Sequence, residues 1–131
     1  MDRALYGKKR VVLVIDSDPA GGARLKRILN KYGYRVYTAV NLKEARRTIS
    51  EKKKIDVALF SLKGFDLAPD QIIKDFKLEK PVIVILEQFS EEVAASALKA
   101  GAVEFLIDPV DSKELIKRLG VCVRMADDGG Y

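Results

Sequence analysis

Short apolar runs alternate along the chain with segments in which apolar residues recur every three or four positions. Runs of four to eight apolar residues suit strands that are buried on both faces of a parallel sheet. In the clearest of these runs, Val11–Ile15 and Asp56–Ser61, polar residues mark the ends. Strands are predicted at residues 11–15, 34–38, 56–61, 81–86 and 103–107.

The intervening segments have helical periodicity, and their ends carry typical capping residues. Asp18 offers a side-chain acceptor at a helix start, Pro19 suits the first helical position, and Gly33 provides a stop. The other helix boundaries are predicted from Asn41 with Glu44, Pro69, Ser90, Gly101, and Asp111 with Glu114. The pattern therefore predicts five helices, one after each strand.

Five strands that alternate with five helices indicate an α/β domain, with one parallel sheet covered on both faces. With right-handed crossovers, the expected architecture is a (βα)5 doubly wound, five-stranded sheet with strand order 2-1-3-4-5. Its switch point lies where the carboxyl ends of the first and third strands meet. Any chemistry is therefore expected around Asp16, Ser17, Asp18 and Ser61.

Length and composition fit a single globular domain. The chain has 131 residues, of which 48% are hydrophobic and 33% charged. No apolar run approaches the ~20 residues of a membrane helix, and no signal-type apolar core follows the basic start. We therefore expect a cytoplasmic protein, with a basic N-terminal extension at 1–9, one domain at 10–124 and a flexible tail at 125–131.

One cysteine and no histidine limit the possible chemistry. They exclude an internal disulfide, Cys/His zinc sites and Cys/His nucleophile pairs. Cys122 lies in an apolar segment and is interpreted as a small core residue. Gly21 and Gly22 lie inside the first helical pattern, so their spacing matches neither a dinucleotide loop nor a P-loop.

The net charge of +5 comes partly from two short basic runs, at residues 8–10 and 52–54. We interpret these runs as solvated ends of secondary-structure elements. A nucleic-acid surface would require basic charge on one face, together with aromatic or base-contacting groups. The sequence displays no such face, so we expect no nucleic-acid partner.

The segment from Arg10 to about Arg124 resembles the receiver domain of bacterial response regulators. The similar segments are 11–19, 33–36, 81–84 and 97–106. Pro109 stands where the family usually has a cis peptide bond, so the resemblance implies a cis bond between Asp108 and Pro109. It also implies the CheY-like, flavodoxin-like version of the expected fold.

The resemblance further implies a phosphotransfer switch. In the family, an aspartate that ends the third strand accepts a phosphoryl group from a histidine kinase. Two acidic residues after the first strand hold Mg²⁺, while a Thr or Ser ending the fourth strand and a Lys ending the fifth contact the phosphoryl oxygens. Mg²⁺ and the ammonium neutralise the charge that develops during transfer.

This sequence departs from the family at most of those positions. The departures are Ser61 at the phosphoacceptor, Ser17 at a metal-binding acid, Leu86 at the Thr/Ser position and Asp108 at the Lys position. Asp16 persists as the remaining candidate metal ligand, with Asp18 nearby. One acid and a neutral serine make a poor Mg²⁺ site, since hard divalent ions favour clustered carboxylates. We therefore expect no bound metal or other cofactor.

Ser61 has two interpretations. A serine hydroxyl can act as a nucleophile if a base such as Asp16 or Asp108 lies beside it. We favour the second interpretation, a hydrogen-bonded residue at a strand end. Phe105 stands at the family's switch aromatic position, and we expect it to pack on Leu86 in one fixed conformation.

The sequence thus favours a degenerate, phosphorylation-independent receiver-like domain that is not an enzyme. We expect it to act in two-component signalling by binding a protein, through the surface of the fourth helix, fifth strand and fifth helix; a homodimer is also compatible. Two alternatives stay open: a working phosphorelay receiver with an altered site, and a module that binds a small ligand or nucleic acid. The expected contact residues are Ala94, Lys99, Phe105 and Lys113.

Overall fold

The computed structural model describes residues 10–52, 54–63, 73 and 80–127. Within these residues strands alternate with helices, as predicted. The exception is the segment between β3 and β4, where the expected helix lies largely outside the described residues. In order, the elements are β1 (Val11–Ile15), α1 (Pro19–Lys31), β2 (Arg35–Ala39), α2 (Leu42–Lys52), β3 (Val57–Ser61), β4 (Val82–Leu86), α4 (Glu91–Ala100), β5 (Glu104–Ile107) and α5 (Ser112–Asp127).

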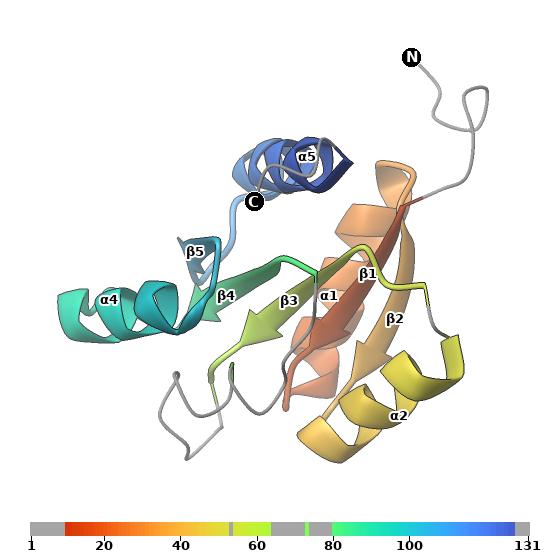
Figure 1. Cartoon of the computed structure of the whole chain (residues 1–131), viewed down its shortest axis with the longest axis horizontal. Coiled ribbons are helices and arrows are strands. Elements are labelled where there is room, and N and C mark those ends of the chain that lie inside the picture. Colours follow the sequence, from red (N-terminus) through yellow and green to blue (C-terminus); the bar gives the residue numbers. More distant parts are fainter. Residues whose placement is uncertain (1–9, 53, 64–72, 74–79, 128–131) are drawn as a thin grey trace.

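The strands form one parallel sheet in the order β2-β1-β3-β4-β5 (Figure 1), which confirms the predicted doubly wound fold. β1 lies between β2 and β3, so that Val12 is opposite both Val36 and Val57. On the other side of β3, Leu59 is opposite Ile83. The order reverses between β1 and β3, and this places the ends of these two strands side by side at the predicted switch point.

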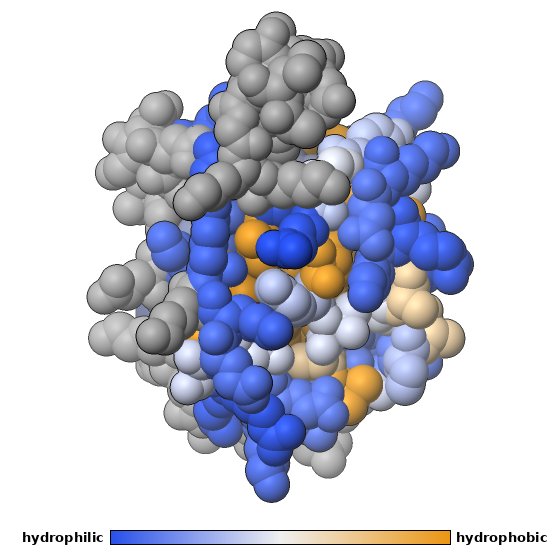
Figure 2. All heavy atoms as spheres, turned by 90° about the vertical axis from the view of Figure 1, so that its right-hand side faces the viewer, coloured by the Kyte–Doolittle hydropathy of each residue, from blue (hydrophilic) through white to orange (hydrophobic). Residues whose placement is uncertain are grey.

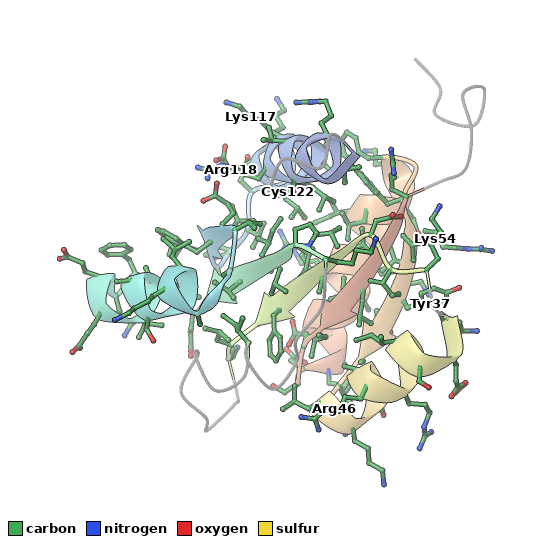
Figure 3. The ribbon with its side chains drawn as sticks, in the orientation of Figure 1. Tyr37, Arg46, Lys54, Lys117, Arg118 and Cys122 are labelled. Carbon is green, nitrogen blue, oxygen red and sulfur yellow. The ribbon has the colours of Figure 1, made fainter. Side chains whose placement is uncertain are left out.

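Two apolar layers cover the sheet because side chains along each strand alternate between its faces. Leu13 and Phe60 point to the layer shared with α2 and α4, whereas Val14 and Leu59 point to the layer shared with α1 and α5. Cys122 lies in the second layer and its side chain points from α5 toward the sheet (Figure 3), which confirms its predicted core position.

Local capping bonds form where the sequence places them. The Asp18 side chain accepts from the Ala20 N–H (3.1 Å) at the start of α1. Ser90 Oγ accepts from the Val93 N–H (3.3 Å) at the start of α4. The predicted helix stop Gly101 has a φ of 121°, a conformation that favours glycine.

Some boundaries differ from the predictions. β2 runs from Arg35 to Ala39, one residue later than expected, and β3, β4 and β5 each begin one residue later. α5 continues to Asp127, past the point where a flexible tail was expected, because Met and Ala at 125 and 126 are good helix formers. The loop at 63–66 and the helix expected after Pro69 fall largely outside the described residues; within that helix, Ile73 is helical and buried.

The position of Ala94 corrects another expectation. Ala94 was expected on the contact surface of the fourth helix, but its side chain is buried with the α2 and α4 layer. Alanine is short, and on this face of α4 it lets the helix backbone approach the sheet. Lys99 and Lys113 are exposed and Phe105 is half-buried, so these three remain accessible.

Among the described residues, no helix is long and apolar enough to cross a membrane. The face at the β2 edge is covered mainly by hydrophilic side chains in its described part (Figure 2). This edge strand carries exposed Arg35 and Thr38. Charged residues on an edge strand disfavour pairing with the strand of another molecule.

Candidate functional site

A cavity of about 350 Å³ opens at the carboxyl edge of the sheet. It lies where β1 and β3 end, between the first turn of α1 and the segment that follows β5. Its charged and polar lining consists of Asp16, Asp18, Arg24, Ser61, Lys63 and Asp108, and its larger apolar lining of Leu25, Ile85, Pro109 and Val110. The peptide bond between Asp108 and Pro109 is cis.

Asp16 follows β1 directly and is only 8% exposed. Its Oδ1 accepts a hydrogen bond from the Asp18 N–H (2.9 Å), and its own N–H donates to the Ala39 carbonyl (2.9 Å). A Cβ atom at Gly21 would lie 2.5 Å from Asp16 Oδ2. Glycine at this position therefore lets the first turn of α1 approach the carboxylate.

The surroundings of Asp16 favour its neutral form. Burial raises the pKa of the Asp16 carboxyl above its ordinary value, whereas the hydrogen bond from the Asp18 N–H lowers it. The negative charges of Asp18 and Asp108 raise this pKa further, and the ammonium of Lys63 lowers it. The net direction is upward, because burial is the largest of these effects.

Ser61 is the last residue of β3 and is 7% exposed. Its position at the strand end agrees with the prediction, but the expected side-chain hydrogen bond is not found. Among the described residues, Ser61 Oγ makes no hydrogen bond, and neither Asp16 nor Asp108 accepts one from it. The hydroxyl therefore has no base in hydrogen-bond contact with it, which activation as a nucleophile requires.

The two residues after Asp16 have structural bonds. Ser17 Oγ donates to the Lys63 carbonyl (2.9 Å), which ties the end of β1 to the segment after β3. Asp18 caps α1 through its Oδ1. In the described part of the chain, no group of three or more acidic, histidine or cysteine side chains is arranged to hold a metal ion.

Residues 12–120 match the family model for the response regulator receiver domain. The chain belongs to this family. It is 30% identical over 115 residues to the transcriptional regulatory protein ZraR of Klebsiella oxytoca, a match that covers 85% of this chain and 26% of that protein. The chain thus spans about a quarter of the length of the first curated relatives that it matches.

Shorter proteins match over nearly their whole length. Protein PilH of Pseudomonas aeruginosa is 28% identical over 113 residues, which cover 82% of this chain and 93% of PilH. The crystal structure of a receiver domain protein from Clostridium thermocellum has a TM-score of 0.79 and 27% identity, covering 90% of this chain and 97% of that one. A CheY-like receiver domain from Methanospirillum hungatei has a TM-score of 0.82 at 24% identity, covering 94% and 100%, and shows the shared fold.

In this receiver domain, only part of the predicted site comes together. Asp16, Asp18, Ser61 and Asp108 line the cavity, with Pro109, whereas Ser17, Leu86 and Phe105 do not. Successive side chains of β4 point to opposite faces of the sheet, which explains why Leu86 does not line the cavity. Ile85 lies on the face that carries the cavity, and Leu86 lies in the layer on the other face.

Leu86 and Phe105 of the receiver domain instead belong to the layer under α4. Leu86 is 2% exposed, and Phe105 packs against the cluster that contains it. The Phe105 ring also lies 6.2 Å, centroid to centroid, from that of Phe89, which is 61% exposed. Phe105 therefore packs against the cluster that includes Leu86, as expected.

Two basic residues in the receiver cavity were not predicted. Arg24 Nη2 donates to the Val110 carbonyl (3.0 Å) and joins α1 to the segment after β5. Lys63 follows Ser61 by two residues and lies at the exposed rim. Neither residue has a local sequence signal, because a contact between positions 86 residues apart is set by the tertiary fold.

Proposed function

We propose that this receiver domain is a cytoplasmic signalling module that acts without phosphorylation, by binding another protein. The observation that carries the proposal is a serine, Ser61, at the end of β3, where 7% of the residue is exposed. The resemblance implies an aspartate nucleophile at this position. A serine without a hydrogen-bonded base is a weak nucleophile, so phosphoryl transfer to this site is disfavoured.

Charge at the cavity supports the same proposal. A phosphoryl group would add negative charge beside the carboxylates of Asp16, Asp18 and Asp108. Asp108 stands where the resemblance implies a lysine ammonium that would offset this charge. Like charges at short range disfavour each other. Burial is the largest cause of the raised pKa of the Asp16 carboxyl, and the negative charges of Asp18 and Asp108 raise it further.

The residues present do not fit the Mg²⁺ that the family implies. Asp16 Oδ1 already accepts the Asp18 N–H, and the Ser17 hydroxyl donates to a carbonyl. Asp18 is committed as the cap of α1. Mg²⁺ requires near-octahedral oxygen ligands, for which one buried carboxylate oxygen and a neutral hydroxyl are a poor basis. The proposed function therefore includes no metal step.

The packing of Phe105 supports a single signalling conformation. Leu86 fills the core where the resemblance implies a hydroxyl that would close on a phosphoryl group. An apolar side chain there offers no hydroxyl through which a group in the cavity could act on Phe105. NMR would test this step, since two slowly exchanging sets of Phe105 ring signals would contradict one fixed orientation.

The contact surface that we propose comprises the accessible side chains of α4, β5 and α5. Leu98 on α4 and Phe89, two residues before that helix begins, are exposed apolar residues, and Phe105 lies beside Phe89. Lys99, next to Leu98 in the chain, and Lys113, in the first turn of α5, are also exposed. Exposed aromatic groups with a charged surround are typical of protein interfaces.

Intact mass spectrometry tests the absence of phosphorylation. The chain is incubated with Mg²⁺ and a small phosphodonor, beside a receiver domain that accepts phosphate under the same conditions. We expect an adduct on the control protein and none on this chain. A stable phosphoryl adduct that the Ser61→Ala variant lacks would show a working phosphorelay receiver with an altered site, and would overturn the proposal.

Co-purification from the native cell tests the contact surface. We expect Ser61→Ala to retain the same partners as the unaltered chain, because the cavity is not the contact site. Phe89→Glu places a charge on the proposed surface and should release them. Retention of every partner by Phe89→Glu, or their loss with Ser61→Ala, would contradict the proposal.

Binding of a polyanion is a second candidate function, favoured by a charge asymmetry. The sequence from 19 to 54, which includes α1, β2 and α2, contains eleven Lys or Arg and two acidic residues. Among the described residues, none of these basic side chains forms an ion pair. Arg46 and Lys54 extend outward from the protein (Figure 3). DNA retention that falls steeply with salt would support this candidate, and its absence at low salt would exclude it.

A further inference from the structure

Two short basic runs of the sequence, at residues 8–10 and 52–54, lead into strands that pair with each other. They precede β1 and β3, which lie side by side in parallel. At the start of these strands the Asp56 N–H donates to the Val11 carbonyl (2.8 Å), and the Asp56 carboxylate forms an ion pair with Arg10 (4.0 Å). Strand pairing therefore brings the described ends of both runs to one place, the amino edge of the sheet.

The start of β2 adds a further basic group to this edge. The Arg35 N–H donates to the Arg10 carbonyl (2.9 Å), and Arg35 is exposed. Lys52 Nζ lies 5.3 Å from the centre of the Tyr37 ring, which packs on the α2 side of β2. Because alternate residues of a strand share a face, Arg35 lies on the same side of β2 as Tyr37 and Lys52. Lys54, whose N–H donates to the Lys52 carbonyl (2.6 Å), extends outward from this edge (Figure 3).

The end of α1 lies beside the start of β2. Lys31 is the last residue of α1 and Tyr32 is its C-cap; both are exposed, and 45% of Tyr32 is accessible. The Tyr34 N–H donates to the Leu29 carbonyl (3.0 Å), so the chain turns directly from α1 into β2. The amino-edge cluster is defined as these four cations and one aromatic residue: Lys31, Arg35, Lys52, Lys54 and Tyr32.

The four cations of the amino-edge cluster are not neutralised within the described part of the chain. Each of these residues is exposed, and none of them forms an ion pair there. The acids closest to them in the sequence are Glu51 and Asp56. Asp56 is already bound to Arg10 and accepts the Val11 N–H (2.7 Å). This leaves Glu51 against four positive charges.

Stabilisation of helix ends accounts for only part of this charge. Lys31 and Lys52 lie in the last turns of α1 and α2, where the helix dipole favours a cation. Arg35 and Lys54 lie outside both helices, so the dipole does not explain them. The cluster therefore carries a surplus of positive charge that suits an anionic partner.

The exposed apolar side chains help to select the kind of anion. In the described part of the chain the large ones are Tyr32, Phe89, Leu98 and Val121, and only Tyr32 belongs to the amino-edge cluster. A protein interface has an apolar core, and a helix that binds a membrane surface buries an apolar face. Four cations beside one aromatic ring instead match a single-stranded nucleic acid, whose phosphates bind basic groups and whose bases stack on aromatic side chains.

We propose that the amino-edge cluster binds single-stranded nucleic acid, with phosphates on its four cations and a base stacked on Tyr32. This inference rests on the second candidate function, binding of a polyanion, and names its site and its ligand class. The sequence, in which the basic runs lie far apart, predicts no nucleic-acid partner. Strand pairing supplies the single basic face, with an aromatic group beside it, that such a partner requires.

Fluorescence anisotropy of the full chain with a labelled oligodeoxythymidylate of about 12 nucleotides tests the binding. Each phosphate of a single strand that is neutralised contributes about −0.7 to the slope of log affinity against log salt concentration. Four contacts should therefore give a slope of about −3. A slope near zero would overturn the proposal. No binding at low salt would overturn both the proposal and the second candidate function.

Unlabelled competitors identify the ligand class. We expect the single strand to compete about tenfold better than a blunt duplex of equal length, because only its bases are free to stack. Poly-glutamate of equal charge should also compete less well. Equal competition by the duplex would overturn the assignment to single strands, and equal competition by poly-glutamate would assign the surface to an acidic protein instead.

Charge variants locate the phosphate contacts. Arg35→Gln and Lys54→Gln alter exposed side chains, and each should reduce the steepness of the salt dependence by about 0.7. Lys117→Gln is the matched control, since Lys117 is exposed on α5 and lies away from Lys54 (Figure 3). It should leave the slope unchanged. Unchanged slopes in both cluster variants, or an equal change in Lys117→Gln, would overturn the site and leave the second candidate function in place.

Variants of Tyr32 test the stacking. Tyr32→Leu keeps an apolar side chain but removes the aromatic ring, so it should weaken binding of the single strand by about tenfold without changing the salt slope. Tyr32→Phe keeps the ring and should bind as the unaltered chain does. Equal affinity of Tyr32→Leu and Tyr32→Phe would refute the stacked base. Phosphoryl adducts and co-purified proteins are measured separately, so failure here leaves the leading proposed function intact.

Discussion

Replacing Gly21 by alanine should destabilise the protein, although alanine is the better helix former. Gly21 lies in the first turn of α1, against the side chain of Asp16. The new Cβ would lie 2.5 Å from Asp16 Oδ2, closer than real Cβ atoms approach, and 3.2 Å from its Cγ, which is also a tight contact. Because the carboxylate is buried and its Oδ1 is bound to the Asp18 N–H, it cannot move away without loss.

The magnitude follows from two opposing contributions. Alanine in place of glycine stabilises a helix interior by about 1 kcal/mol, and by less near its end. Displacing Asp16 breaks a hydrogen bond to a charged acceptor, which costs about 1.5–3 kcal/mol. We therefore expect Gly21→Ala to lower the free energy of unfolding by about 0.5–2 kcal/mol.

Gly120 in α5 is the matched control. A Cβ atom there would have Arg124 Nη1 at 3.8 Å as its nearest neighbour, which is ordinary contact with a flexible side chain. Gly120→Ala should therefore raise the free energy of unfolding by up to about 1 kcal/mol. The two substitutions have the same chemistry and opposite expected signs.

Urea denaturation followed by circular dichroism measures both effects. A third measurement places Gly21→Ala in an Asp16→Ala background, where the clash no longer exists. There the glycine substitution should be neutral or stabilising, so that the two changes are strongly coupled. The reasoning is refuted if Gly21→Ala stabilises the unaltered chain as Gly120→Ala does, or if its cost persists in the Asp16→Ala background.

Three further predictions concern Asp16, Leu86 and α4. Because the pKa of the Asp16 carboxyl is raised, the folded state binds the carboxyl proton more tightly than the unfolded state does. The contribution of Asp16 to stability therefore falls as pH rises from the ordinary pKa of Asp through the raised pKa. Asp16→Asn should therefore gain stability relative to the unaltered chain between pH 4 and pH 7 in urea denaturation, and a constant difference would contradict this. Because the Leu86 side chain fills the core, Leu86→Ala should lower the free energy of unfolding by about 2–5 kcal/mol in the same assay, and Leu86→Met by less than about 1.5 kcal/mol. Equal losses for the two variants would argue against a packing role. Ser90→Ala should lower the free energy of unfolding by about 1 kcal/mol, because the α4 cap is lost. Ser96→Ala, within the same helix, should raise it by about 0.5 kcal/mol. Thermal denaturation measures both, and effects of the same sign would count against capping.

The sequence by itself determined the elements and their order. Val11–Ile15 and Val57–Ser61 form buried strands because nearly every position in them is apolar, which no amphipathic helix permits. The caps at Asp18 and Ser90 were predictable for a different reason. Each capping bond joins residues two or three apart, so its geometry depends only on the local chain.

Only the tertiary structure decided which residues share the cavity. Ile85 and Leu86 are adjacent and both apolar, yet one lines the cavity and the other fills the opposite layer, because the pleat of β4 and its register fix their directions. The contact of Arg24 with Val110 joins positions far apart in the chain and follows from the packing of α1 beside the end of β5. Such contacts depend on how elements are placed together, which local periodicity does not encode. For the same reason, the close approach of Gly21 to Asp16, and the lack of a partner for Ser61 Oγ among the described residues, could be found only in three dimensions.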